Sequence, residues 1–188
     1  TYPAAHQDCM NAYKWLLSND YEPQQIILGG DSAGAFFVLQ TLLEIKRQGL
    51  DQPQAAFLLS PLADALYFNG ESYVSKRKRD PWLKADQIPA LVDLYLGESP
   101  DRPSSLSPIN ANLLGFPPIL THVGEDEILL SDSLRLHQQL QAHGVSSELT
   151  VWPGMWHVFH CMGGKLPQAR QAISQVGDFI KVHLQTLA

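Results

Sequence analysis

Residues 25–36 read QIILGGDSAGAF, in which a short apolar run ends on two glycines and small residues follow at once. An apolar run this short, without polar alternation, is typical of a parallel strand that is buried on both faces. A helical pattern then extends from Ala33 to about Gln48 and stops before Gly49. A buried strand that turns directly into a helix predicts an α/β sheet, with Ser32 at the tip of the turn.

The same alternation of apolar runs and helical stretches continues along the chain. Further strands are expected over 55–59, 118–123 and 148–152, and helices over 5–18, 131–143 and about 168–187. The first helix is expected to present one apolar face, formed by Cys9, Ala12, Tyr13, Leu16 and Leu17. We therefore predict one domain over residues 1–188, with a mostly parallel sheet covered by helices on both faces.

Residues 64–117 interrupt this alternation with a long stretch rich in Pro, Ser, Asp and Tyr, in which a helix is expected only near 86–96. An insertion of this length between core strands is usually functional. We expect 64–117 to contribute to a binding pocket or a cap.

The net charge of −6 argues against nucleic acid as a partner, because nothing in the composition attracts phosphates. The one basic run, 76–79, is interpreted as a solvated loop. No apolar run approaches the roughly 18 residues of a membrane span, and the first residues lack the pattern of a signal peptide. Two cysteines, Cys9 and Cys161, make no disulfide framework and are expected to be buried free thiols. A cytoplasmic protein is the expectation from these features.

The turn at Ser32 fits the G-x-S-x-G nucleophile elbow, which requires a strand before it and a helix after it. Positions 30 and 34, two residues before and after Ser32, are expected to require a residue as small as glycine, because strand and helix backbones crowd together there. The Ala33 amide, at the start of the helix, could donate to a developing oxyanion. The alternative is a helix N-cap at Asp31 or Ser32.

A serine hydroxyl needs a base, and in an elbow the chain order is serine, acid, histidine. Of the seven histidines, His157 and His160 lie on the loop after the last expected strand, and His157 directly follows a Pro-Gly turn. His122 lies inside a strand, where a hydrogen-bonded core role is expected. The remaining histidines, His6, His137, His143 and His183, precede the elbow or lie on helices. No third ligand converges on His157 and His160, so no metal is expected.

Carboxylates for the acid position follow the strand at 118–123, in the stretch Gly124-Glu125-Asp126-Glu127 and at Asp132. Several of them must be ordinary loop or first-turn helix charges. Reasoning from the residues alone leaves the choice among them open.

Three motifs together resemble the hormone-sensitive lipase family of α/β-hydrolase esterases, the bacterial family IV group. They are GDSAG at 30–34, VGEDEILLSDS at 123–133 and PGMWHVF at 153–159. The resemblance implies the α/β-hydrolase fold, with Ser32 as nucleophile, His157 as general base and the Ala33 amide in the oxyanion hole. Aligning Leu129 with the leucine of the family's Asp-Pro-Leu pattern puts Glu127 at the acid position, with Asp126 as second candidate and Asp132 as third.

The family also carries a His-Gly-Gly-Gly loop upstream of the elbow, whose amides complete the oxyanion hole. Glycine pairs occur here only at 29–30 and 163–164, so this loop is absent from the chain. By the resemblance, the chain looks like the C-terminal part of a longer esterase, without the N-terminal strands.

The resemblance implies a serine carboxylesterase acting on short-to-medium acyl esters through an acyl-enzyme. It further implies a small-molecule ester as the substrate and a reaction that needs no cofactor or metal. The excursion around Tyr67, Tyr73, Trp82 and Leu83 is expected to line part of the substrate pocket, with core packing as the expectation for each of these side chains taken singly. The alternatives are a receptor-like member of the fold that binds without catalysis, or an amidase or acyltransferase with the same triad. A homo-oligomer is compatible with the sequence.

Overall fold

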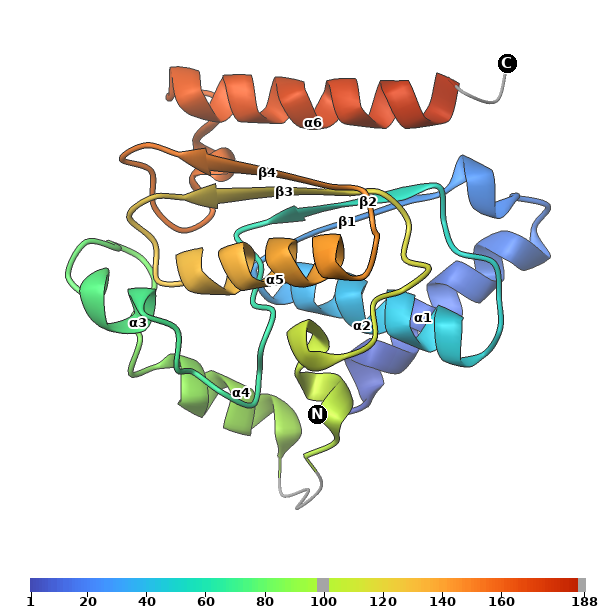
Figure 1. The fold of residues 1–188 in the computed structure, drawn as a ribbon, viewed down its shortest axis with the longest axis horizontal. Helices are drawn as coiled ribbons and strands as arrows, with labels where there is room; N and C mark the ends of the chain where they lie inside the picture. The colour runs from blue at the N-terminus through green and yellow to red at the C-terminus, as the bar shows by residue number, and fades with distance from the viewer. Residues whose placement is uncertain (98–101, 186–188) are drawn as a thin grey trace.

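The computed structural model describes residues 1–97 and 102–185, and over these residues it shows one sheet with helices on both of its faces (Figure 1). The strands are β1 (Ile27–Asp31), β2 (Ala55–Leu59), β3 (Ile119–Gly124) and β4 (Ser147–Trp152). They lie in the order β1-β2-β3-β4, and each neighbouring pair is parallel. The predicted α/β class is confirmed.

Helices connect the strands in the way that the alternation predicted. The α-helices are α1 (Ala4–Ser18), α2 (Ala33–Arg47), α3 (Ser72–Ser75), α4 (Ile88–Leu96), α5 (Leu130–Ala142) and α6 (Pro167–Gln185). Short 3-10 helices lie at η1 (Pro23–Gln25), η2 (Ser104–Leu106), η3 (Pro108–Asn110) and η4 (Phe159–Met162). The first strand starts at Ile27 rather than at 25 because Pro23–Gln25 forms η1. Of the helix expected over 168–187, residues 186–187 lie outside the described residues.

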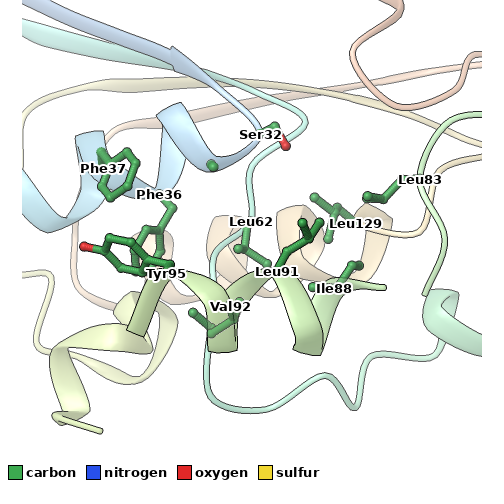
Figure 2. Close-up of a pocket in the computed structure, with 12 residues that line it drawn as sticks. Ser32, Phe36, Phe37, Leu62, Leu83, Ile88, Leu91, Val92, Tyr95 and Leu129 are labelled. Carbon is green, nitrogen blue, oxygen red and sulfur yellow. The ribbon is translucent and has the colours of Figure 1, made fainter. Parts of the chain in front are cut away.

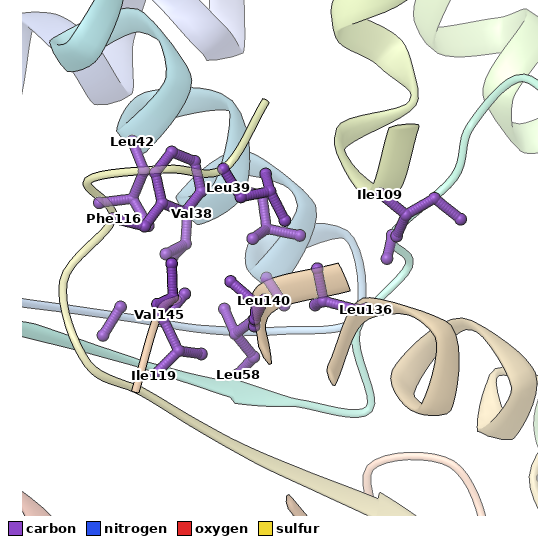
Figure 3. Packing of buried hydrophobic residues seen from close by; sticks show 14 residues of the cluster. Val38, Leu39, Leu42, Leu58, Ile109, Phe116, Ile119, Leu136, Leu140 and Val145 are labelled. Carbon is purple, nitrogen blue, oxygen red and sulfur yellow. The ribbon is translucent and has the colours of Figure 1, made fainter. Parts of the chain in front are cut away.

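The main core lies between the sheet and the helices α2 and α5 (Figure 3). Leu39, Leu42, Leu58 and Leu140 are fully buried in this cluster. On the opposite face, α6 packs Val176 and Phe179 against the sheet (Figure 1). Both faces are therefore covered, which explains why the strands read as continuous apolar runs.

Helix α1 packs against α2, and it buries Met10 and Tyr13. The expected apolar face is wrong at Ala12, which is exposed. The expectation of buried thiols is also wrong. Cys9 is half-buried and Cys161 is exposed, although both are free.

The segment between β2 and β3 holds α3, α4, η2 and η3; α3 and α4 lie at lower left in Figure 1, on the side of the sheet that carries α2 and α5. Residues 98–101 of the expected excursion lie outside the described residues. The basic run is not only a solvated loop, because Lys76 and Arg79 pair with Asp126 at 3.4 and 3.1 Å. None of the helices in the described ranges is long and apolar enough to cross a membrane.

Candidate active site

Ser32 lies between β1 and α2, at the carboxyl edge of the sheet. Its backbone has φ 51° and ψ −117°, which a residue with a side chain rarely adopts, and its N–H donates to the Leu59 carbonyl at 2.9 Å. Such strain persists only where the surroundings impose it. Ser32 does occupy the N-cap position of α2, but its side chain makes no capping hydrogen bond, so capping does not account for the serine.

The close approach of strand and helix backbones expected at this turn is seen at Gly30 but not at Gly34. A Cβ at Gly30 would lie 2.4 Å from the backbone carbon of Gly34, so strand and helix can approach only if residue 30 has no side chain. A Cβ at Gly34 would meet nothing closer than the Asp31 carboxylate at 3.5 Å, an ordinary contact. The size restriction therefore applies to Gly30 and not to Gly34.

His157 reaches Ser32 from the loop after β4. Its Nε2 lies 2.9 Å from the Ser32 Oγ, and its Nδ1 lies 2.9 Å from Oε2 of Glu127. The imidazole is buried, with 7% of the residue exposed, and Glu127 is fully buried. The three side chains come from loops after β1, β3 and β4, and parallel strands bring these loops to one edge.

Each of the other carboxylates near Glu127 has a different partner. Asp126 pairs with the basic run, Glu125 accepts the Gly154 N–H at 3.0 Å, and Asp132 accepts the Ala63 N–H at 3.0 Å. Of the carboxylates that the sequence left open, the structure brings Glu127 to His157.

A cavity of about 180 Å³ opens beside Ser32, between α2 and α4 (Figure 2). Its wall is almost wholly apolar. It is lined by Ser32, Ala33, Phe36, Phe37, Leu62, Ala65, Leu83, Ile88, Leu91, Val92, Tyr95 and Leu129. In Figure 2, the α4 side chains face those of α2 across the space, with Ser32 at one end. The excursion thus contributes one wall of this cavity.

Of the four aromatic and aliphatic residues around which the excursion was expected to line a pocket, only Leu83 lines this cavity. Tyr73 is buried in the apolar cluster that adjoins the cavity through Ile88 and Leu129. Tyr67 is exposed, and the Trp82 ring lies edge-on to Trp156. The excursion instead lines the cavity mainly with aliphatic side chains of α4, namely Ile88, Leu91 and Val92. The helix expected near 86–96 was the sequence signal that could have pointed to these residues.

Sequence reasoning also missed Ser60. This serine directly follows β2 and is fully buried, and its Oγ lies 2.9 Å from Oε1 of Glu127. The available signal was its position, because polar residues at the carboxyl ends of parallel strands commonly belong to sites.

Two further imidazole rings lie behind the site. His122 and His160 are buried, their rings are stacked with centroids 5.7 Å apart, and none of their ring nitrogens has a hydrogen-bond partner among the described residues. The expectation of a hydrogen-bonded His122 is therefore wrong. Burial lowers the pKa of His122 to about 4 and that of His160 to about 3, where His122 and His157 contribute further. Over residues 1–97 and 102–185, no group of three or more His, Cys, Asp or Glu side chains could hold a metal ion.

A parallel sheet with a serine at a strand–helix turn, and with an acid and a histidine on later loops, is the arrangement found in α/β hydrolases. Residues 1–161 match the family described as alpha/beta hydrolase fold, and the chain belongs to this family. A solved esterase of the bacterial hormone-sensitive lipase family superposes with a TM-score of 0.93 at 36% identity, covering 98% of this chain and 62% of that one. This confirms the resemblance inferred from the three motifs.

Curated relatives agree with this placement. An acetyl-hydrolase of Streptomyces hygroscopicus is 34% identical over 180 residues, which make up 96% of this chain and 60% of the relative. An esterase of Acinetobacter venetianus is 33% identical over 180 residues, or 95% of this chain and 59% of the relative. The chain thus spans about 60% of the length of these relatives.

Proposed function

We propose that the protein is a serine carboxylesterase in which Ser32 is the nucleophile, His157 the general base and Glu127 the acid. The observation that carries the proposal is the continuous chain of two 2.9 Å contacts, from the Ser32 Oγ through the imidazole to the carboxylate. The relatives named esterase and acetyl-hydrolase support the same chemistry. A non-catalytic receptor would not need this serine–imidazole contact.

In the proposed reaction, the Ser32 Oγ attacks the ester carbonyl while Nε2 of His157 takes its proton. Glu127 accepts the Nδ1–H, which fixes the tautomer and stabilises the imidazolium as it forms. The imidazolium then protonates the departing alcohol, and an acyl-enzyme remains. Water activated by His157 releases the acid in the second half of the reaction.

The Ala33 amide is the proposed donor to the oxyanion. Ala33 is the first residue of α2, and the first N–H groups of a helix have no partner within the helix. The positive end of the helix dipole adds to the stabilisation of negative charge at this point. Removing one such donor typically costs about 10²–10³ in kcat.

The apolar cavity is the proposed acyl site. Its volume of about 180 Å³ is similar to that of apolar cavities of about 150 Å³ that admit benzene, a six-carbon molecule. Burying each CH₂ of an acyl chain contributes about 0.8 kcal/mol. Short-to-medium acyl groups, up to about six carbons, therefore fit the space better than long chains.

The nucleophile assignment is tested with a fluorophosphonate probe and with p-nitrophenyl esters of increasing acyl length. We expect the full chain to be labelled and to hydrolyse the butyrate ester, and Ser32→Ala to lose both properties. Labelling that persists in Ser32→Ala would refute Ser32 as the nucleophile. An amidase would instead prefer the matching anilides.

The acid is tested by comparing Glu127→Gln with Asp126→Asn. Replacing the triad acid by its amide costs about 10⁴ in kcat in a serine protease, because the imidazole then adopts the wrong tautomer. We expect a loss of about 10³–10⁴ for Glu127→Gln and less than about tenfold for Asp126→Asn, which is paired with Lys76 and Arg79. The reverse order would move the role to Asp126.

A further inference from the structure

We propose that Ser60 is a positioning residue, which joins Glu127 to the backbone that carries His157 and so holds the imidazole in line with Ser32. The inference rests on the proposed function and names a residue that this function had not assigned. Among the described residues, Ser60 is not part of the cavity wall, and its hydroxyl hydrogen-bonds to Glu127 and to the backbone of Val158. It would therefore act through Glu127 and His157 and not on the substrate.

The backbone of Ser60 is fixed from the neighbouring strand. Its N–H donates to the His122 carbonyl of β3 at 2.7 Å, directly after β2 ends. Its φ of 51° lies in the left-handed region, which costs roughly 1 kcal/mol or more for a residue with a side chain. A serine kept in this conformation, and fully buried, points to a specific use of its hydroxyl.

The direction of both Ser60 hydrogen bonds follows from its partners. The Val158 N–H can only donate, so the Ser60 Oγ accepts from it, at 3.0 Å. The hydroxyl proton is then free for Oε1 of Glu127, at 2.9 Å. An ionised carboxylate can only accept, so this is the arrangement in which both contacts are satisfied.

These contacts leave Glu127 little freedom to rotate. Its Oε1 accepts from Ser60 and from the Gly124 N–H, while Oε2 faces the Nδ1 of His157. Two donors on one oxygen fix the plane of the carboxylate, so that the second oxygen is aimed at the imidazole.

The same hydroxyl fixes the other side of the pair. Val158 directly follows His157 and has φ 50° and ψ 37°, a left-handed conformation that is unfavourable for a β-branched residue. The hydrogen bond from its amide to Ser60 helps to hold this conformation. Ser60 thus connects the loop after β3, which carries Glu127, with the loop after β4, which carries His157. Glu127 and His157 are 30 residues apart in the sequence.

The experiment compares Ser60→Ala and Ser60→Gly in the full chain, with p-nitrophenyl butyrate as substrate. Both variants lack the hydroxyl, but glycine also removes the strain of the positive φ. We expect kcat to fall about 10- to 100-fold in both, as it does when a supporting partner of a site residue is lost, while KM stays within about twofold. Ser133→Ala is the matched control. It removes an equally buried hydroxyl that donates to the Leu129 carbonyl, and we expect kcat to stay within about twofold.

A second measurement separates positioning from a structural role. If Ser60 acts through Glu127, its loss costs little once the acid is gone. Ser60→Ala in a Glu127→Gln background should therefore lower kcat by less than about threefold. Full kcat in Ser60→Gly, or full additivity in the double variant, would overturn the inference. Absence of esterase activity in the parent protein would instead refute the proposed function.

Discussion

Replacing Asp132 by asparagine changes the pH dependence of stability in a direction that the structure fixes. Asp132 is fully buried in the first turn of α5, and one of its oxygens accepts the Ala63 N–H at 3.0 Å. Burial raises the pKa of Asp132 to about 7, and the Asp64 carboxylate raises it further, while the Ala63 and Asp64 amides and the Arg135 guanidinium act in the opposite sense.

The sign and size of the effect follow from proton linkage. Between pH 3.8 and about 7 the folded protein holds the proton on Asp132, whereas the unfolded chain has lost it. The free energy of unfolding therefore falls as the pH rises through this window, and the loss is complete above about 7. At about 1.4 kcal/mol per pKa unit, the full interval from 3.8 to about 7 corresponds to roughly 4 kcal/mol as an upper limit.

Asparagine has nearly the same shape and retains an oxygen for the Ala63 N–H, but it does not ionise. Urea unfolding of both proteins at pH 4.5, 6 and 8 gives the difference between their unfolding free energies. We expect this difference to move in favour of Asp132→Asn by about 2–4 kcal/mol between pH 4.5 and pH 8. The other titrating groups are common to both proteins, so a constant difference would refute the argument that Asp132 is protonated in the fold near neutral pH.

The remaining predictions concern packing at the elbow and the stacked histidines. Gly30→Ala should prevent folding or lower the free energy of unfolding by at least about 3 kcal/mol, because the added Cβ would overlap backbone atoms. Gly34→Ala should change the free energy of unfolding by no more than about 1 kcal/mol. Thermal unfolding of the two variants checks this, and equal losses would contradict it. Because the folded pKa values of His122 and His160 lie below 6.5, the unfolded chain takes up protons first as the pH falls, so these residues destabilise the protein in acid. His160→Phe should therefore lose less stability than the parent between pH 7 and pH 4.5, as measured by urea unfolding, and an equal loss would show that this imidazole does not contribute.

The contrast between Glu127 and its neighbours shows where sequence reasoning stops. Adjacent loop residues offer the same carboxylate to the same region, and a difference of one position decides which way each side chain points. Asp126 turns to Lys76 and Arg79, and Glu127 turns inward to His157. The resemblance to the esterase family pointed to Glu127, but the residues alone could not.

The sequence by itself determined the features that depend on neighbours in the chain. Uninterrupted apolar runs predicted the buried parallel strands, and the glycines around Ser32 predicted a tight strand–helix turn, because both depend on local backbone geometry and on burial.

Only the tertiary structure decided the features that depend on contacts between distant segments. These are the pairing of Glu127 with Ser60, 67 residues away, the apolar wall that α4 contributes to the cavity, and the lack of a partner within the described residues for the ring nitrogens of His122. Each depends on how far a strand end extends and on the direction in which a loop leaves it. Many packed contacts fix these quantities together, and no short stretch of sequence specifies them.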